Sequence, residues 1–213
     1  MPSSSFFPAN GALLTRRSVL LGAAILGVGA LAACGNEASR PFNNTDVTGA
    51  VPDFAFQMTR VDDGAEVTAS DYLGKVTLLY FGYTFCPDIC PTTLANVAEI
   101  LGKLGKDATN VRFLFVTVDP NRDTPEVLKA YVDAFGDQVD GLRGTPDQLT
   151  ELARRYRVSY SVTPKGDGFD VTHSSAIYVF DKKGKARLLV SSLGTAKPEI
   201  DGTVDDLRRL AGA

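Results

Sequence analysis

Two cysteines and one histidine are the side chains of this sequence that best suit metal or thiol chemistry. Cys86 and Cys90 are separated by three residues, and His173 is the single histidine of the 213-residue chain. By itself, such a pair is compatible with a structural disulfide, with thiol–disulfide exchange or with a shared metal ion. Each cysteine is followed by a proline, Pro87 or Pro91, which restricts the backbone and favours a functional site with fixed sulfur positions.

The predicted elements bring these side chains to one edge of a sheet. The apolar run 76–81 is typical of a central strand buried on both faces, and a helix follows the cysteine segment. Cys90 lies at or beside the helix start, where the positive end of the helix dipole is expected to lower the pKa of a thiol. His173 directly precedes a predicted strand over 176–180. If that strand runs antiparallel to 76–81, His173 can approach both sulfurs; otherwise it is an ordinary surface or capping histidine.

Two thiolates and one imidazole restrict the choice of metal. A closed zinc site needs four protein ligands, and a blue-copper site needs two histidines. Cu(I) is soft and accepts few, thiolate-rich ligands, so three-coordinate binding by Cys86, Cys90 and His173 suits it. Cu(II) would require an added oxygen ligand. Met58 has no motif around it, and we interpret it as a packing residue.

The remaining pattern predicts an α/β domain over residues 53–213. We expect a thioredoxin-like mixed sheet with flanking helices and an N-terminal β-hairpin extension. Pro91 is expected as the first residue of the helix after the cysteines, and Thr124 and Thr145 as N-caps of two later helices. The expected strands are 54–60, 65–68, 76–81, 111–118, 176–180 and 186–191, and a terminal helix is expected over 203–210.

The N-terminal segment has the pattern of an export signal. Arg16 and Arg17 precede an uncharged apolar run over 19–33, which favours a twin-arginine signal peptide over residues 1–33. The run ends in Leu-Ala-Ala-Cys, which resembles a bacterial lipobox with Cys34 as the site of lipid attachment. Residues 34–52 would form a flexible lipid-anchored tether. An uncleaved anchor helix is the alternative, and both interpretations place the domain at the cell membrane on its extracytoplasmic side.

Charge and composition exclude several classes of function. With 22 basic and 25 acidic residues, the chain lacks the basic field of a general nucleic-acid binder. A serine hydrolase is disfavoured because no Gly-x-Ser-x-Gly motif accompanies the single histidine.

Three segments of the chain read YFGYTFCPDICP at 80–91, VTVDPNRDTP at 116–125 and HSSAIY at 173–178. In order and spacing they resemble the Sco/SenC copper-chaperone family, and the resemblance spans roughly residues 50–211. The resemblance implies a thioredoxin-like fold in which Cys86, Cys90 and His173 bind one copper ion. It also implies a role in assembling the CuA centre of cytochrome c oxidase, or in keeping the thiols of that centre reduced. The implied partners are the CuA-bearing subunit and another copper carrier or a thiol reductant, and the lipobox-like segment adds the membrane through the lipid anchor.

Two functions therefore stay open. The first is a metallochaperone, with no catalytic residues, that hands on copper by ligand exchange. The second is a thiol–disulfide reductase that acts through a redox disulfide between Cys86 and Cys90. Asp119, Arg122 and Asp123 follow the strand 111–118 at the same edge, where they would contact a partner, orient the site, or only close a turn and cap a helix.

Overall fold

The computed structural model describes residues 40–165 and 168–212, and one compact unit extends from Phe42 to the C-terminus. The strands are β1 (Thr45–Asp46), β2 (Gln57–Arg60), β3 (Glu66–Thr68), β4 (Val76–Gly82), β5 (Val111–Thr117), β6 (Val139–Arg143), β7 (Tyr160–Lys165), β8 (Gly168–His173), β9 (Ile177–Phe180) and β10 (Ala186–Val190). The α-helices are α1 (Ile89–Leu104), α2 (Pro125–Asp133), α3 (Pro146–Arg155) and α4 (Ile200–Gly212), with short 3-10 helices at Ala69–Tyr72 and Gly105–Asn110.

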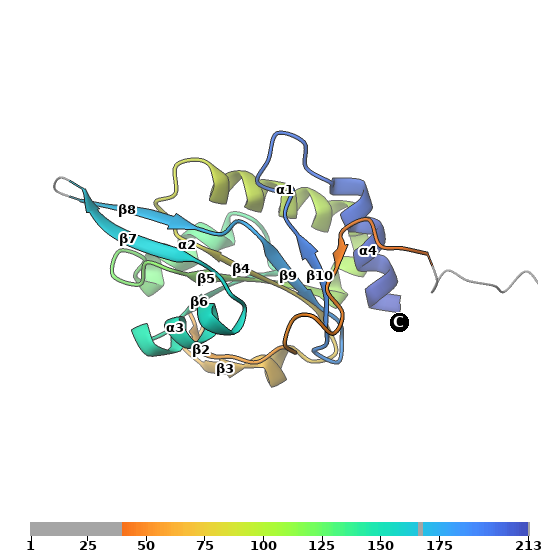
Figure 1. Cartoon of the computed structure of the whole chain (residues 1–213), viewed down its shortest axis with the longest axis horizontal. Helices are drawn as coiled ribbons and strands as arrows, with labels where there is room; N and C mark the ends of the chain where they lie inside the picture. The colour runs from red at the N-terminus through yellow and green to blue at the C-terminus, as the bar shows by residue number, and fades with distance from the viewer. Residues whose placement is uncertain (1–39, 166–167, 213) are drawn as a thin grey trace, which may run out of the picture. The chain divides into compact units, whose positions relative to one another are not determined.

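The main sheet is mixed, with the order β1-β10-β9-β4-β5-β6-β2-β3. Its centre is parallel, because β4 pairs with β5 and β5 with β6 in the same direction. β9 pairs with β4 in the opposite direction, with Leu79 opposite Tyr178, which is the antiparallel arrangement on which an approach of His173 to the sulfurs depends. β7 and β8 form a separate two-stranded hairpin that extends away from this sheet (Figure 1).

Alternation along β4 explains the layers on either side of the sheet. Leu78 and Tyr80 face one apolar cluster, together with residues of α1, α2 and α4. Leu79 and Phe81 face the other cluster, together with residues of α3. Successive side chains of a strand point to opposite faces, so a continuous apolar run requires a cover on both sides. Figure 1 shows α1 on one side of the sheet and α3 on the other.

Local sequence signals located most of these elements. Thr124 and Thr145 are the N-caps of α2 and α3, and each is followed by a proline, as expected. The predicted N-terminal hairpin is confirmed as β2 and β3. The helix after the cysteines differs, because α1 begins at Ile89 and Pro91 is its third residue rather than its first. The terminal helix likewise begins at Ile200, before residue 203.

Four strands were not expected, namely β1, β6, β7 and β8. β6 reads Val-Asp-Gly-Leu-Arg, which contains only two apolar residues and lacks the pattern of a buried strand. β7 contains Pro164, a residue that usually argues against a strand and is tolerated at an edge. Among the described residues, β8 pairs with β7 alone, in a two-stranded sheet separate from the main one.

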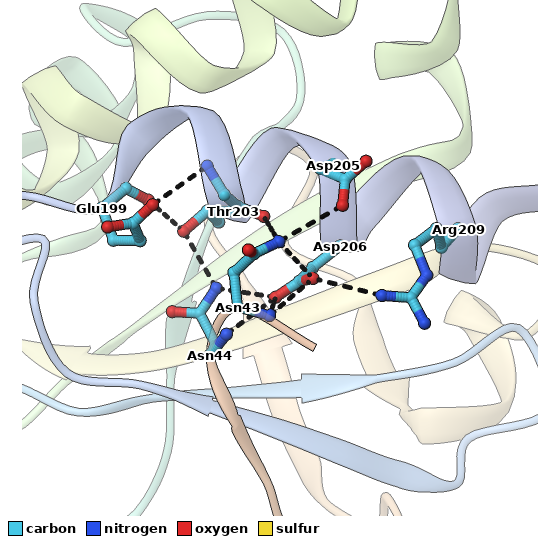
Figure 2. A network of polar contacts seen from close by, with 8 residues as sticks. Asn43, Asn44, Glu199, Thr203, Asp205, Asp206 and Arg209 are labelled. Carbon is cyan, nitrogen blue, oxygen red and sulfur yellow. Dashed lines mark hydrogen bonds and ion pairs between the residues drawn. The ribbon is translucent and has the colours of Figure 1, made fainter. Parts of the chain in front are cut away.

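The segment before the first hairpin forms part of the compact unit. β1 pairs with β10 inside the range 34–52 that the sequence assigned to a tether, so the unit begins at Phe42 rather than at residue 53. Figure 2 shows Asn43 and Asn44 converging on the carboxylate of Asp206 in α4. The predicted signal peptide and Cys34 lie outside the described residues. No helix in the described ranges has the length and apolarity to cross a membrane.

Candidate metal site at the β4–α1 loop

Both cysteines lie where β4 leaves the sheet and α1 begins. Cys86 belongs to the connecting loop and is partly exposed, Cys90 is the second residue of α1, and the two do not form a disulfide in the structure. The backbone N–H of Cys90 donates a hydrogen bond to Sγ of Cys86 at 3.4 Å. The first N–H groups of a helix lack a carbonyl partner within it, so this sulfur satisfies one of them. The two thiols are therefore held together at the carboxyl end of a parallel strand, where α/β folds place their sites.

The sulfur of Cys90 is enclosed by the core. The residue is 0% exposed, and the Tyr80 hydroxyl donates to its Sγ at 3.6 Å. Burial raises the pKa of the Cys90 thiol to about 12, and this effect exceeds that of a backbone hydrogen bond from Tyr83, which lowers the pKa. The expectation that the helix start lowers this pKa is therefore wrong for Cys90. The loss of water around the thiolate destabilises it more than its hydrogen bonds stabilise it.

Gly82, the last residue of β4, allows Phe115 of β5 and Cys90 of α1 to lie close to its backbone. A Cβ atom at Gly82 would lie 2.6 Å from Cζ of Phe115 and 3.1 Å from Sγ of Cys90. Phe115 is fully buried in β5, so its ring cannot move away freely. A side chain at position 82 would collide with Phe115 of the neighbouring strand β5, so this position requires glycine.

The start of the loop is tied to the neighbouring β5–α2 connection by a buried carboxylate. Asp123 accepts hydrogen bonds from the backbone N–H of Thr84 at 3.1 Å and from its hydroxyl at 2.6 Å. It also accepts one from the hydroxyl of Thr117, at the end of β5, at 2.5 Å. The interpretation of Asp123 as a helix cap is wrong, because the side chain of Thr124 performs the capping of α2.

A second contact joins the same two loops through the side chain of Arg122. The Arg122 guanidinium forms an ion pair with the buried carboxylate of Asp119. It also lies over the rings of Tyr83 and Phe85, with its Cζ 5.8 Å and 5.2 Å from their centroids. Such contacts are favourable because a cation is attracted to an aromatic face. Asp119 also closes the turn expected of it, because its carbonyl accepts the backbone N–H groups of Arg122 and Asp123.

The backbone of the histidine segment runs along the same edge. β8 ends at His173, which is paired with Tyr160. Because β9 runs antiparallel to β4, with Leu79 opposite Tyr178, the start of β9 lies toward the end of β4 from which the cysteine loop leaves. The side chain of His173 lies outside the described side chains. Among those described, no three His, Cys, Asp or Glu residues come together as a metal site.

Comparison with known proteins identifies relatives over most of the compact unit. A family model described as SCO1/SenC matches residues 46–210. The Arabidopsis thaliana protein "SCO1 homolog 1, mitochondrial" is 35% identical over 150 residues, which cover 70% of this chain and 45% of the relative. The SCO2-like protein RP587 of Rickettsia prowazekii is 39% identical over 129 residues, covering 59% and 63%. The chain thus spans less than two thirds of the length of these relatives.

Solved structures share the fold. ScoI of Bradyrhizobium japonicum, with copper bound, is 36% identical with a TM-score of 0.67, covering 74% of this chain and 98% of that chain. A SCO1/SenC family lipoprotein from Bacillus anthracis is 26% identical with a TM-score of 0.66, covering 80% and 99%. BsSco, described with a disulfide switch and as a member of the Sco family of cytochrome c oxidase assembly proteins, is 25% identical with a TM-score of 0.59, covering 81% and 97%. These likenesses confirm the expected thioredoxin-like α/β fold.

Proposed function

Because the chain belongs to the SCO1/SenC family, we propose that it binds copper as cargo and takes part in the assembly of cytochrome c oxidase. The copper-bound ScoI relative supports the cargo, and the description of BsSco supports the process. In this proposal Cys86, Cys90 and His173 hold the copper, and the acceptor is the CuA-bearing subunit of the oxidase. The observation that carries the proposal is the hydrogen bond from the N–H of Cys90 to Sγ of Cys86, which holds two reduced cysteines together at the sheet edge.

The donor set suits Cu(I), and Cu(II) would need a further oxygen ligand. Thiolates are soft ligands that select Cu(I), and a three-coordinate site leaves room for an incoming ligand. An acceptor thiolate would enter beside Cys86, because Cys86 is partly exposed whereas Cys90 is buried. One copper–sulfur bond breaks as the new one forms, and the released thiolates take up protons. The oxidation state of copper does not change in this exchange.

A thiol–disulfide reductase is the second candidate, supported by the disulfide switch named for BsSco. The partly exposed Cys86 would attack an acceptor disulfide as a thiolate and release one acceptor sulfur. Cys90, as its thiolate, would then displace the second sulfur. The products are a Cys86–Cys90 disulfide and a reduced acceptor, and a thiol reductant would restore the pair.

Replacing His173 by alanine separates the two candidates. If the imidazole is the third ligand, His173→Ala weakens Cu(I) binding by about tenfold or more, because the metal loses one of three donors. Reduction of a peptide disulfide by Cys86 and Cys90 should change less than about threefold. Anaerobic competition with a Cu(I) chelator measures the first quantity, and a thiol-release assay measures the second. An unchanged copper affinity would exclude His173 as a ligand.

Copper affinity should increase with pH. Burial raises the pKa of Cys90 to about 12, so at neutral pH this sulfur is a thiol and must lose its proton to bind Cu(I) as thiolate. If binding releases one proton, the affinity rises about tenfold for each pH unit. Because the pKa of Cys90 is raised, this rise continues above the ordinary thiol pKa of 9.0. Chelator competition at pH 6, 7 and 8, corrected for protonation of the chelator, measures the slope. A flat profile would contradict binding through the Cys90 thiolate.

The domain is proposed to be held at the membrane, on its extracytoplasmic side, through a lipid on Cys34 that follows a cleaved signal peptide over residues 1–33. The B. anthracis relative supports this proposal because it is described as a lipoprotein. Cells expressing the full chain and fed an alkyne-labelled fatty acid should label the wild type. The Cys34→Ser variant should carry no label, and a labelled variant would exclude Cys34 as the attachment site.

A further inference from the structure

Asp123 is a buried carboxylate whose hydrogen bonds connect the cysteine loop to β5. The residue is 0% exposed, and its partners are Thr84 in the cysteine loop and Thr117 in β5. Within the described part of the chain, no lysine or arginine forms an ion pair with it. Removing a carboxylate from water is costly unless hydrogen-bond donors replace the water. Here three such donors converge on the carboxylate, two of them from Thr84.

The connection reaches the first sulfur through a tight turn. The N–H of Cys86 donates to the carbonyl of Tyr83 at 3.3 Å, so Thr84 lies inside the turn that presents Cys86. The sulfur of Cys86 in turn accepts the N–H of Cys90. Fixing both the N–H and the hydroxyl of Thr84 therefore restrains the turn on which the distance between the two thiols depends.

We propose that Asp123 is a positioning residue of the copper site, which holds the cysteine loop in the conformation that brings Cys86 to Cys90. The inference rests on the proposed function for its meaning, but its structural part can be measured without copper. Asp123 does not touch either sulfur in this proposal. Its hydrogen bonds to Thr84 keep the loop ordered in the apoprotein, so that copper binding does not have to order the loop.

A matched control lies away from the cysteine loop, where α4 meets the segment just before β1. Asp206 in α4 is also 0% exposed, and its carboxylate accepts hydrogen bonds from the backbone N–H groups of Asn43 and Asn44 at 2.9–3.0 Å (Figure 2). Replacing either aspartate by alanine removes a buried carboxylate and leaves donors without a partner. Only the Asp123 variant is expected to affect the cysteine loop.

Amide hydrogen exchange in the full apoprotein, measured by NMR in detergent, tests the inference. The readout is the exchange rate at the amides of Thr84 and Cys90 divided by that at Phe113 in β5, whose N–H donates to the carbonyl of Gln138 just before β6. We expect Asp123→Ala to raise this ratio about tenfold, because unsatisfied buried donors favour local opening. Asp206→Ala should leave the ratio within about twofold, although it destabilises the domain. If Asp123 only stabilised the fold as a whole, the exchange ratio would change by the same factor in Asp123→Ala and Asp206→Ala.

Thr84→Val keeps the test decisive if Asp123→Ala does not fold. It removes one of the three donors, retains the backbone N–H and should raise the ratio by about threefold. An unchanged ratio in Thr84→Val and in any folded Asp123→Ala, or an equal increase in Asp206→Ala, would overturn the inference. In the copper arm, Asp123→Ala should lose about tenfold in Cu(I) affinity, and Asp206→Ala less than twofold. A wild-type protein that binds no copper would refute the proposed function, while the exchange ratio would still decide the role of Asp123.

Discussion

Replacing Cys90 by serine is expected to weaken Cu(I) binding by at least about a hundredfold. The substitution exchanges a soft thiolate for a hydroxyl, which is a poor ligand for Cu(I) and stays protonated at neutral pH. It removes one of the three proposed donors while nearly preserving side-chain shape in a fully buried position. Anaerobic competition with a Cu(I) chelator measures the affinity, and urea unfolding of the apoprotein shows whether the fold is retained. Cys86→Ser should give a loss of similar size.

Met58→Leu provides the matched control for this result. Met58 is also fully buried, and among the side chains that the structure describes it is the one sulfur outside the cysteine pair. It packs in the cluster on the opposite face of the sheet from Cys90, as its interpretation as a packing residue predicted. Its replacement should leave the copper affinity within about twofold. A Cys90→Ser protein that folds and keeps wild-type affinity would refute the proposed ligand set.

Placing a methyl group on Gly82 is expected to lower the stability of the domain substantially. In Gly82→Ala the new Cβ would lie 2.6 Å from the ring of Phe115, which is 0% exposed and packed by neighbouring aromatic rings. Overpacking of this kind costs about 1–3 kcal/mol of unfolding free energy. For a chain of this size, that corresponds to a melting temperature lower by about 3–10 °C. Thermal and urea unfolding of the apoprotein measure the effect.

Gly102→Ala is the control for the glycine prediction. Gly102 lies in α1 and is exposed, and apart from its chain neighbours and the nearby backbone of its own helix, no described atom lies within 4 Å of the position that a methyl group would occupy there. Alanine is the better helix former, so this substitution should stabilise the protein by about 0.5–1 kcal/mol. If Gly82→Ala were equally neutral or stabilising, the close approach of Gly82 to Phe115 would not limit the packing of the site.

Sequence patterns predicted those elements whose formation depends on residues close together in the chain. The apolar run of β4 requires cover on both faces, and a helix must follow the cysteine segment because its apolar residues recur at helical spacing. Thr124 and Thr145 begin helices because a threonine cap followed by proline satisfies the first turn. These signals placed Cys86 and Cys90 at a strand–helix junction. They missed β6, whose sequence lacks the pattern and which forms by pairing with β5 and β2.

The chemistry of the individual groups was decided only by the tertiary structure. Cys90 has a raised rather than a lowered pKa because core packing removes the water that would stabilise its thiolate. Asp123 binds Thr84, 39 positions away in the chain, and Asp206 binds Asn43 across nearly the whole unit. No local pattern encodes these contacts, since they depend on which loops the sheet order brings together. The sequence by itself therefore predicted three copper ligands, and it located the two cysteines at the junction between β4 and α1. The tertiary structure determined how the thiols are buried and which distant carboxylate restrains the loop that carries them.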